Sequence, residues 1–246
     1  MMDITAEEKL MYKVMKAIYD SGIPVDFKGA MVLKACLMNA GYTGVIRHTM
    51  DIDANWYSDS PPTVAQMEKS LTDALRKNGI DLSVHLYRMY GEGRSAGFEL
   101  SDPDADEILF TMDMDVNRPA QSTQIYDIAG LRFRGISPMQ MLADKISAIS
   151  TEAVFRRIKD VVDLYYLSQV FELDQSALMS TIINSGRQLG NFYGFLYRLD
   201  DLQHAYEKFR FTGEADKPSF NDVYGAVKQY VMALLPNDYM GETDND

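Results

Sequence analysis

The stretch Arg47-His-Thr-Met-Asp-Ile-Asp53 contains two aspartates separated by one apolar residue. On a β-strand, residues two positions apart project to the same face and lie roughly 7 Å apart. Asp51 and Asp53 would then direct two carboxylates to one spot, with Ile52 on the opposite, buried face. Carboxylate oxygens suit Mg²⁺, which binds through one or two carboxylates together with substrate phosphates. The stretch therefore predicts a strand that carries a metal site for a phosphorylated substrate.

The aspartate pair gains weight from a segment that precedes it. Aspartate and glutamate make up 36 of the 246 residues, so random placement would give roughly five acidic pairs at this spacing. The upstream Phe27-Lys-Gly-Ala30 has a glycine where a helix is expected to begin, and exposed amides at a helix N-terminus bind phosphate. A phosphate-binding turn followed by a metal-binding pair indicates phosphoryl transfer.

Two-metal phosphoryl transfer needs a third carboxylate, which should come from a neighbouring strand. The run Ile108-Leu-Phe-Thr-Met-Asp-Met-Asp-Val116 supplies candidates, because strand alternation puts Asp113 and Asp115 on one face. We favour Asp115, since a strand end tends to border a cleft. Asp113 remains an alternative, and either residue could instead lie on a solvated edge strand.

Further polar side chains flank the predicted metal site. Lys28 and Arg47 could each meet a triphosphate or could be ordinary exposed basic residues. The hydroxyl of Thr49, two residues before Asp51 and expected on the same strand face, could bind phosphate or pair across the sheet.

The composition bounds the class of protein. Hydrophobic residues make up 46% and charged residues 24% of the chain, as in an ordinary globular protein. No apolar run approaches the roughly 18–20 residues that span a bilayer, and the acidic N-terminus lacks a signal-peptide pattern. The single cysteine, Cys36, rules out an intramolecular disulfide framework. We therefore expect a cytoplasmic protein.

The net charge of −12 argues against a wide nucleic-acid-binding face. An RNA acceptor would need a local basic strip. Such a strip could act despite the negative net charge, because salt screens exposed charges beyond about 8–10 Å. The candidates are Arg132, Arg134, Arg187, Arg198, Lys208 and Arg210.

Hydrophobic periodicity and turn signals predict an α+β fold in two parts. Residues 1–136 are expected to form a mixed sheet with helices. The expected helices there are 6–20, 29–40 and 63–79, and the extended runs are 43–57, 81–89, 95–101, 106–116 and 122–134. Residues 137–240 are expected to be all helical, over 138–150, 152–170, 175–186, 191–210 and 219–235. Residues 241–246 are expected to form a disordered tail.

The helical part carries a second group of charged residues. Lys159 and Asp163 are four residues apart, which makes them neighbours on one helical surface, and Asp160 shares a face with Asp163. Such a pattern usually belongs to a solvated helix face with salt bridges. Alternatively, Lys145 and Lys159 could neutralise triphosphate charge.

The order of these motifs resembles the AbiEii/AbiGii nucleotidyltransferase toxins of bacterial abortive-infection systems. The resemblance covers about residues 26–168. The motifs are Lys28-Gly29, Arg47-x-Thr49-x-Asp51-Ile52-Asp53, Leu142-Ala143-x-Lys145 and Arg157-x-Lys159-Asp160-x-x-Asp163-Leu164. The last of these motifs is the most specific.

The resemblance implies a polymerase-β-like nucleotidyltransferase fold with a helical C-terminal half. It also implies two Mg²⁺ ions, a nucleoside triphosphate, transfer to RNA such as transfer RNA, and a cognate antitoxin. Position by position, it assigns Asp51 and Asp53 to metal binding, Gly29 to the phosphate-binding turn, and Lys145 and Asp160, with Lys159 beside it, to the helical motifs. Together with the strand analysis, the expected catalytic residues are Asp51, Asp53, Asp115, Lys145 and Asp160, of which the first three are expected to bind metal. The expected nucleotide-binding residues are Lys28, Gly29, Ala30, Arg47, Thr49, Lys145 and Lys159. Lys145, Lys159 and Asp160 are expected within about 12 Å of Asp51, in a nucleotide-sized pocket.

One position departs from the family pattern. Ala30 stands where the family usually has glycine or serine, so a backbone amide but no hydroxyl is available for phosphate. A non-catalytic nucleotide-binding or interaction module on the same fold is therefore an alternative. A second alternative is a nucleotidyltransferase that modifies a small molecule, which suits the negative charge better than RNA does.

Overall fold

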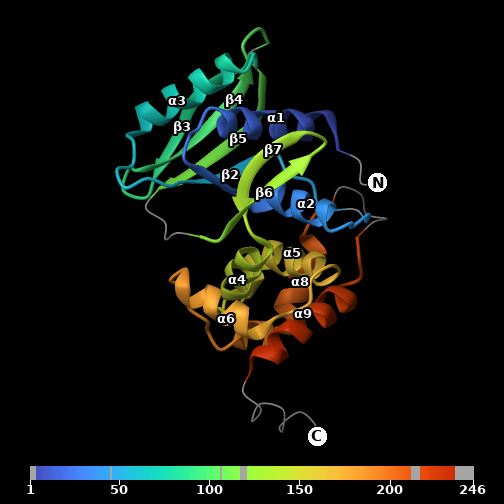
Figure 1. The fold of residues 1–246 in the computed structure, drawn as a ribbon. Coiled ribbons are helices and arrows are strands. Elements are labelled where there is room, and N and C mark those ends of the chain that lie inside the picture. The colour runs from blue at the N-terminus through green and yellow to red at the C-terminus, as the bar shows by residue number, and fades with distance from the viewer. Residues whose placement is uncertain (1–3, 45, 106, 117–120, 212–216, 236–246) are drawn as a thin grey trace, which may run out of the picture. The chain divides into compact units, whose positions relative to one another are not determined.

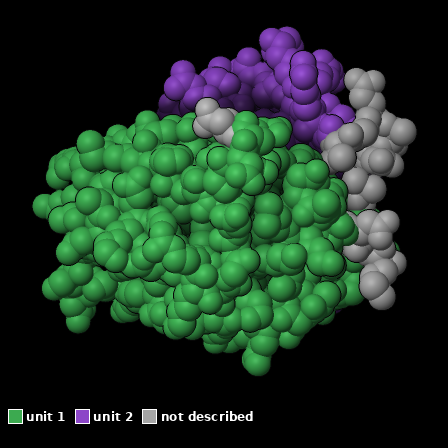
Figure 2. All heavy atoms as spheres, turned by 90° about the horizontal axis from the view of Figure 1, so that it is seen from above, with its two compact units in different colours: residues 1–141 green, residues 142–246 purple. Residues whose placement is uncertain are grey.

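The computed structural model describes residues 4–44, 46–105, 107–116, 121–211 and 217–235 (Figure 1). The chain divides into two compact units, Met1–Met141 and Leu142–Asp246, coloured separately in Figure 2. The first unit contains a mixed sheet with helices and the second is helical. Each unit is described by itself below. The predicted tail, 241–246, lies outside the described residues.

The first unit is built on a seven-stranded mixed sheet with the order β3-β4-β5-β2-β1-β7-β6. The pairs β2–β5 and β1–β7 are parallel, and the other neighbouring strands are antiparallel. The described strands are β1 (Val25–Lys28), β2 (Asp51–Trp56), β3 (Ser83–Tyr90), β4 (Ser95–Asp102), β5 (Glu107–Val116), β6 (Thr123–Ile128) and β7 (Leu131–Ile136). Its first three helices are α1 (Ala6–Asp20), α2 (Gly29–Asn39) and α3 (Val64–Lys77).

One face of the sheet forms the core of this unit. The ring of Tyr12 on α1 stacks on Phe133 of β7 at 5.7 Å, and Phe27 of β1 meets the same ring edge-on at 5.9 Å. Val32 of α2 packs so closely on Gly135 of β7 that a Cβ there would lie 2.8 Å from it. Because side chains alternate along each strand, the residues between these core positions project to the opposite face.

The opposite face carries a polar row that crosses five strands. Lys28 of β1 pairs with Asp53 of β2, and Asp53 pairs with Asp113 of β5. Asp113 in turn pairs with Gly97 of β4, and Gly97 pairs with Arg88 of β3. Directly paired residues share a face, so residues far apart in the sequence meet along this one row.

Local signals predicted the helices well and the strands less well. The predicted capping box of α3 is present, with Thr63 and Gln66 bonded reciprocally. The extended run 43–57 contains a strand only from Asp51 onward, and the four-residue β1 was not predicted. The run 122–134 was expected as one strand but is the hairpin β6–β7, because Ala129 and Gly130 both adopt positive φ and reverse the chain.

The second unit contains most of α4 (Pro138–Ile149), which begins in the first unit, and the helices that follow. Its other elements are η1 (Val154–Arg157), α5 (Ile158–Ser168), α6 (Gln175–Asn184), α7 (Tyr193–Tyr197), α8 (Leu199–Lys208) and α9 (Phe220–Leu234). Two long helices expected here are each broken in two. The 3-10 turn η1 precedes α5, and Arg198, at φ −112° and ψ 50°, separates α7 from α8. Within the described residues, no helix is both long and apolar enough to cross a membrane.

Candidate functional site

The turn from β1 into α2 brings a carboxylate against the start of a helix. Gly29 is the first residue of α2 and has a φ of +72°, a conformation that favours glycine. A Cβ at this position would lie 2.1 Å from Asp53 Oδ2, so only a glycine leaves room for the carboxylate. Lys28, the N-cap residue, makes no side-chain cap. Ala30 is buried behind the turn.

The predicted aspartate pair lies at the start of β2. Asp51 and Asp53 are partly exposed on the polar face, and Ile52 between them is fully buried, as alternation predicts. The hydroxyl of Thr49 donates to Asp51 Oδ1. Thr49 and the half-buried Arg47 precede the strand rather than lying on it, so Thr49 reaches Asp51 from the loop.

The two candidates for the third carboxylate have different neighbours. Asp113 lies directly opposite Asp53, whereas Asp115 lies opposite Asn55. Lys28 Nζ lies 2.6 Å from Asp115 Oδ2 and 2.8 Å from Asn55 Oδ1. The side chain of Asp113 is 26% exposed and that of Asp115 is 13% exposed. The register thus places Asp113 beside Asp53, and Asp115 is ion-paired with Lys28, the N-cap residue of α2.

A group of aromatic and basic side chains on β3 was not predicted. Arg88 lies 2.5 Å from Asp113, and its guanidinium stands 5.1 Å from the ring centre of Tyr87 and 5.4 Å from that of Tyr90. The register of β3 on β4 shifts between Leu86 and Arg88. Such a bulge redirects side chains and is common beside active sites. Gly97 was the available signal, since a glycine within a strand often marks a bulge or a close approach.

Burial and the nearby carboxylates shift the pKa values on β3. Burial is the main cause that raises the pKa of Tyr87, and the negative charge of the nearby Asp113 raises it further. The hydrogen bond to Asp113 is the main cause that raises the pKa of Arg88. Tyr87 is thus neutral and Arg88 cationic at neutral pH, so both can donate hydrogen bonds on this face.

The polar face offers the oxygen donors that Mg²⁺ takes. Asp51, Asp53, Asp113 and Asp115 lie on two adjacent parallel strands, about 4.8 Å apart. Among the described residues, no group of three or more His, Cys, Asp or Glu side chains is already arranged to hold a metal ion. Asp115 is instead ion-paired with Lys28, and Asp113 with Arg88. The donor types fit magnesium, and the predicted metal role of Asp51, Asp53 and Asp115 stays a prediction.

The second unit brings together most of the charged residues predicted there. Lys145 Nζ lies 2.6 Å from Asp163 Oδ2 and 3.3 Å from Asp160 Oδ1, and Arg157 Nε lies 2.9 Å from Asp160 Oδ2. The expectation of a solvated helix face is wrong for Asp163, which is fully buried. Lys159 is exposed. The predicted distance from these residues to Asp51 joins two units and stays a prediction.

Most candidates for the basic strip are engaged by carboxylates. Arg134 Nε lies 2.5 Å from Asp26 Oδ1, and Arg132 Nε lies 3.9 Å from Asp127 Oδ2. Arg187 pairs with Asp144 and Arg198 with Asp201. Lys208 and Arg210 line a surface cavity of about 660 Å³ in the second unit. These pairs reduce the positive charge that the strip could present to RNA.

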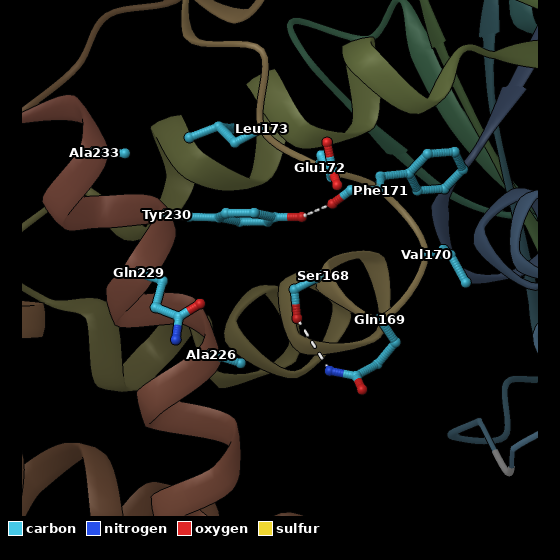
Figure 3. A pocket seen from close by; sticks show the side chains of 10 residues that line it. All are labelled: Ser168, Gln169, Val170, Phe171, Glu172, Leu173, Ala226, Gln229, Tyr230 and Ala233. Atoms are coloured by element: carbon cyan, nitrogen blue, oxygen red, sulfur yellow. Dashed lines mark hydrogen bonds between the residues drawn. The ribbon is translucent and has the colours of Figure 1, made fainter.

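A larger cavity in the second unit contains none of the predicted site residues. It has a volume of about 720 Å³ and lies between α9 and the segment that joins α5 to α6 (Figure 3). The hydroxyl of Tyr230 donates to the carbonyl oxygen of Phe171 at 2.5 Å. The polar face is the better candidate site, because its aspartates, Lys28 and Arg88 are the kinds of charged group that phosphoryl transfer needs.

Comparison with known proteins identifies the family of this chain. The family model described as "Nucleotidyl transferase AbiEii toxin, Type IV TA system" matches residues 20–224. The chain therefore belongs to the AbiEii nucleotidyltransferase toxin family, as the motifs predicted. No curated protein matches the chain significantly.

Two solved structures are similar to this chain at low sequence identity. MenT4, a nucleotidyltransferase toxin from Mycobacterium tuberculosis H37Rv, is 13% identical with a TM-score of 0.52, over 95% of this chain and 85% of that one. An antigenic nucleotidyltransferase-like protein from Paracoccidioides brasiliensis is 17% identical with a TM-score of 0.48, over 86% of this chain and 97% of that one. The likeness to MenT4 supports the predicted fold class.

Proposed function

We propose that this nucleotidyltransferase toxin is magnesium-dependent and transfers a nucleotide from a nucleoside triphosphate to an RNA acceptor in the cytoplasm. The observation that carries the proposal is the contact of Asp53 with the start of α2. A phosphate-binding helix N-terminus and a metal-binding carboxylate have to lie side by side if a metal-bound triphosphate is to meet both. Gly29 permits this contact, since a Cβ would lie 2.1 Å from Asp53 Oδ2.

In this proposal each residue near the turn has a separate task. Asp51 and Asp53 hold Mg²⁺, which supplies positive charge to the triphosphate and the departing pyrophosphate. The amides of Gly29 and Ala30 bind phosphate oxygens. Lys28, now 2.6 Å from Asp115, is close enough to the turn to neutralise phosphate charge. Arg47 and Thr49 are retained as nucleotide-binding candidates.

The transfer step forms one bond and breaks one. The hydroxyl oxygen of the acceptor bonds to the α-phosphorus of the triphosphate. The bond from that phosphorus to the oxygen bridging to the β-phosphorus breaks, and pyrophosphate leaves with the bond electrons. The hydroxyl proton passes to a carboxylate beside the attacking oxygen. The product is the acceptor extended by one nucleoside monophosphate.

The third carboxylate in this step is Asp113 or Asp115. The register favours Asp113, because it lies opposite Asp53 and is the more exposed of the two. Asp115 is held by Lys28 and lies opposite Asn55. Comparing Asp113→Asn with Asp115→Asn distinguishes them, since the residue that takes the proton or binds metal should lose far more transfer rate than its neighbour.

Lys145, Lys159 and Asp160 are proposed to act on the triphosphate from the second unit, as the family motif implies. Lys159 is exposed and therefore accessible to a phosphate, whereas Lys145 is ion-paired with Asp160 and Asp163. A cognate antitoxin encoded beside the toxin is proposed from the type IV toxin–antitoxin family.

The test is incubation of the protein with Mg²⁺, each labelled nucleoside triphosphate in turn, and total RNA. Labelled RNA that disappears with a chelator and with Asp53→Asn supports the proposal. Binding of triphosphate without transfer to any acceptor would favour the non-catalytic module. Transfer to a small molecule but not to RNA would favour the second alternative, which the net charge of −12 also suits.

A further inference from the structure

We propose that Tyr87, Arg88 and Tyr90 on β3 form the platform that holds the terminal nucleotide of the RNA acceptor, with its base stacked on Tyr87. This inference rests on the proposed nucleotide transfer and names the part of the face that receives the acceptor. These three residues are referred to below as the β3 platform.

The position of the β3 platform follows from the direction of the reaction. Attacking and leaving oxygens stand roughly in line on opposite sides of the phosphorus. The phosphate turn at Gly29 lies at the β1 end of the polar row, so pyrophosphate leaves on that side. The acceptor must then approach from the other end of the row, along β5, β4 and β3. Arg88 is the residue at that end.

The chemistry of the β3 platform fits a nucleotide. The ring of Tyr87 is on an exposed residue, at 40% exposure, and aromatic rings of this kind stack bases without regard to their identity. Arg88, whose side chain is 50% exposed, offers a guanidinium for a backbone phosphate. Its pairing with Asp113 ties the platform directly to the row of carboxylates.

The backbone is shaped to keep the ring in this position. The bulge between Leu86 and Arg88 interrupts the alternation of β3, so that Tyr87 and Arg88 both reach Asp113. Opposite them, a Cβ on Gly97 would lie 2.5 Å from Tyr87 Cε1 and 2.8 Å from Asp113 Oδ1. A glycine in the middle of a strand costs stability, and here its absent side chain is what makes room for the ring.

The experiment measures the affinity of the full chain for a short single-stranded RNA, with and without the base at its 3′-terminal nucleotide. Tyr87→Ala should weaken binding of the intact RNA about 5- to 100-fold, the range for loss of one stacked base. It should leave binding of the RNA with the abasic end unchanged. Binding of triphosphate in Mg²⁺ should stay as in the parent, because the phosphate turn is untouched.

Two variants serve as controls. Tyr87→Phe keeps the ring and loses only the hydroxyl, so it should bind RNA like the parent. Tyr19→Ala removes a tyrosine of similar exposure, 36%, from α1. Because Tyr12 of α1 packs on the core face of the sheet, Tyr19→Ala should not change the affinity for RNA.

Several results would overturn the inference. Equal weakening by Tyr87→Ala on both RNAs would show that the terminal base does not stack there. Equal losses in Tyr87→Phe and Tyr87→Ala would show that the hydroxyl supports Asp113 and that the ring makes no contact with RNA. Either result, in a protein that still labels RNA, rejects the β3 platform and leaves the proposed transfer intact. A parent protein that transfers nucleotides only to small molecules rejects both.

Discussion

Replacing Gly29 with alanine tests the geometry of the site. Two constraints act at this position, a positive φ and a close contact with Asp53, and Gly22 provides a control for the first of them. Gly29 has a φ of +72°, and a Cβ there would lie 2.1 Å from Asp53 Oδ2. Gly22 has the same φ of +72°, but a Cβ at that position would meet no atom within 4 Å. Gly22→Ala therefore measures backbone strain alone, and Gly29→Ala adds the collision with the carboxylate.

The expected magnitudes follow from these two constraints. The left-handed conformation costs a residue other than glycine about 1–2 kcal/mol, so both variants should lose about that much free energy of unfolding. In Gly29→Ala the carboxylate of Asp53 must also withdraw from 2.1 Å to at least 3.4 Å before the contact is an ordinary one. A displacement of about 1 Å in an active site can already lower the rate about 100-fold.

The measurements are urea unfolding for stability, calorimetry for triphosphate binding in Mg²⁺, and the rate of nucleotide transfer. Gly22→Ala should bind and transfer like the parent, and Gly29→Ala should be defective in both. If Gly29→Ala were no less stable than Gly22→Ala and bound triphosphate like the parent, the contact between the turn and Asp53 would have no part in the site.

Three further predictions concern other charged groups. Asp51→Asn and Asp53→Asn should each abolish magnesium-dependent triphosphate binding and leave the melting temperature within a few degrees, since both lie on the polar face; collapse of folding in both would show that they support the core instead. Asp163 is fully buried and lies 2.6 Å from Lys145 Nζ, so Asp163→Ala should lower the free energy of unfolding by about 3–5 kcal/mol, whereas Asp144→Ala, which removes a more exposed carboxylate, should lower it by about 1 kcal/mol or less; similar losses in urea unfolding would contradict this. Burial raises the pKa of Asp26 against the opposing effect of its arginine partner. Ionising Asp26 therefore costs stability, so the free energy of unfolding of the parent, relative to Asp26→Asn, should fall as pH rises above about 4. A constant or rising difference across a pH series would contradict the raised pKa of Asp26.

Features set by neighbouring residues were predictable from the sequence. The helix 6–20 has the predicted bounds, and Thr63 caps α3 as its sequence indicates. The shared face of Asp51 and Asp53 also follows from local alternation alone. The same is true of the helix that begins at Gly29, because the positive φ of a glycine is a property of a single position. These are the parts of the fold and site in which a few adjacent residues determine the geometry.

Features set by pairing between distant strands were not predictable in this way. Whether Asp113 or Asp115 lies opposite Asp53 depends on the parallel register of β5 on β2. A change of register by one residue would give every residue of β2 a different partner on β5. The platform on β3 depends further on a bulge and on a glycine in the next strand. In the second unit, spacing predicted that Asp160 and Asp163 share a face, but not that Asp163 is fully buried and ion-paired with Lys145 of α4.

In the proposed function, a protein with a net charge of −12 binds a triphosphate, and the ion pairs of the polar face bear on how it would do so. Lys28 is paired with Asp115, and Arg88 is paired with Asp113. Two Mg²⁺ ions held by the aspartates would bring four positive charges to this face. Their arrival would also compete for the carboxylates that now hold Lys28 and Arg88, which frees a cation beside the phosphate turn and another at the end of the row. On this argument Lys28 and Arg88, which are ion-paired without substrate, become the cations available at the two ends of the transferred group.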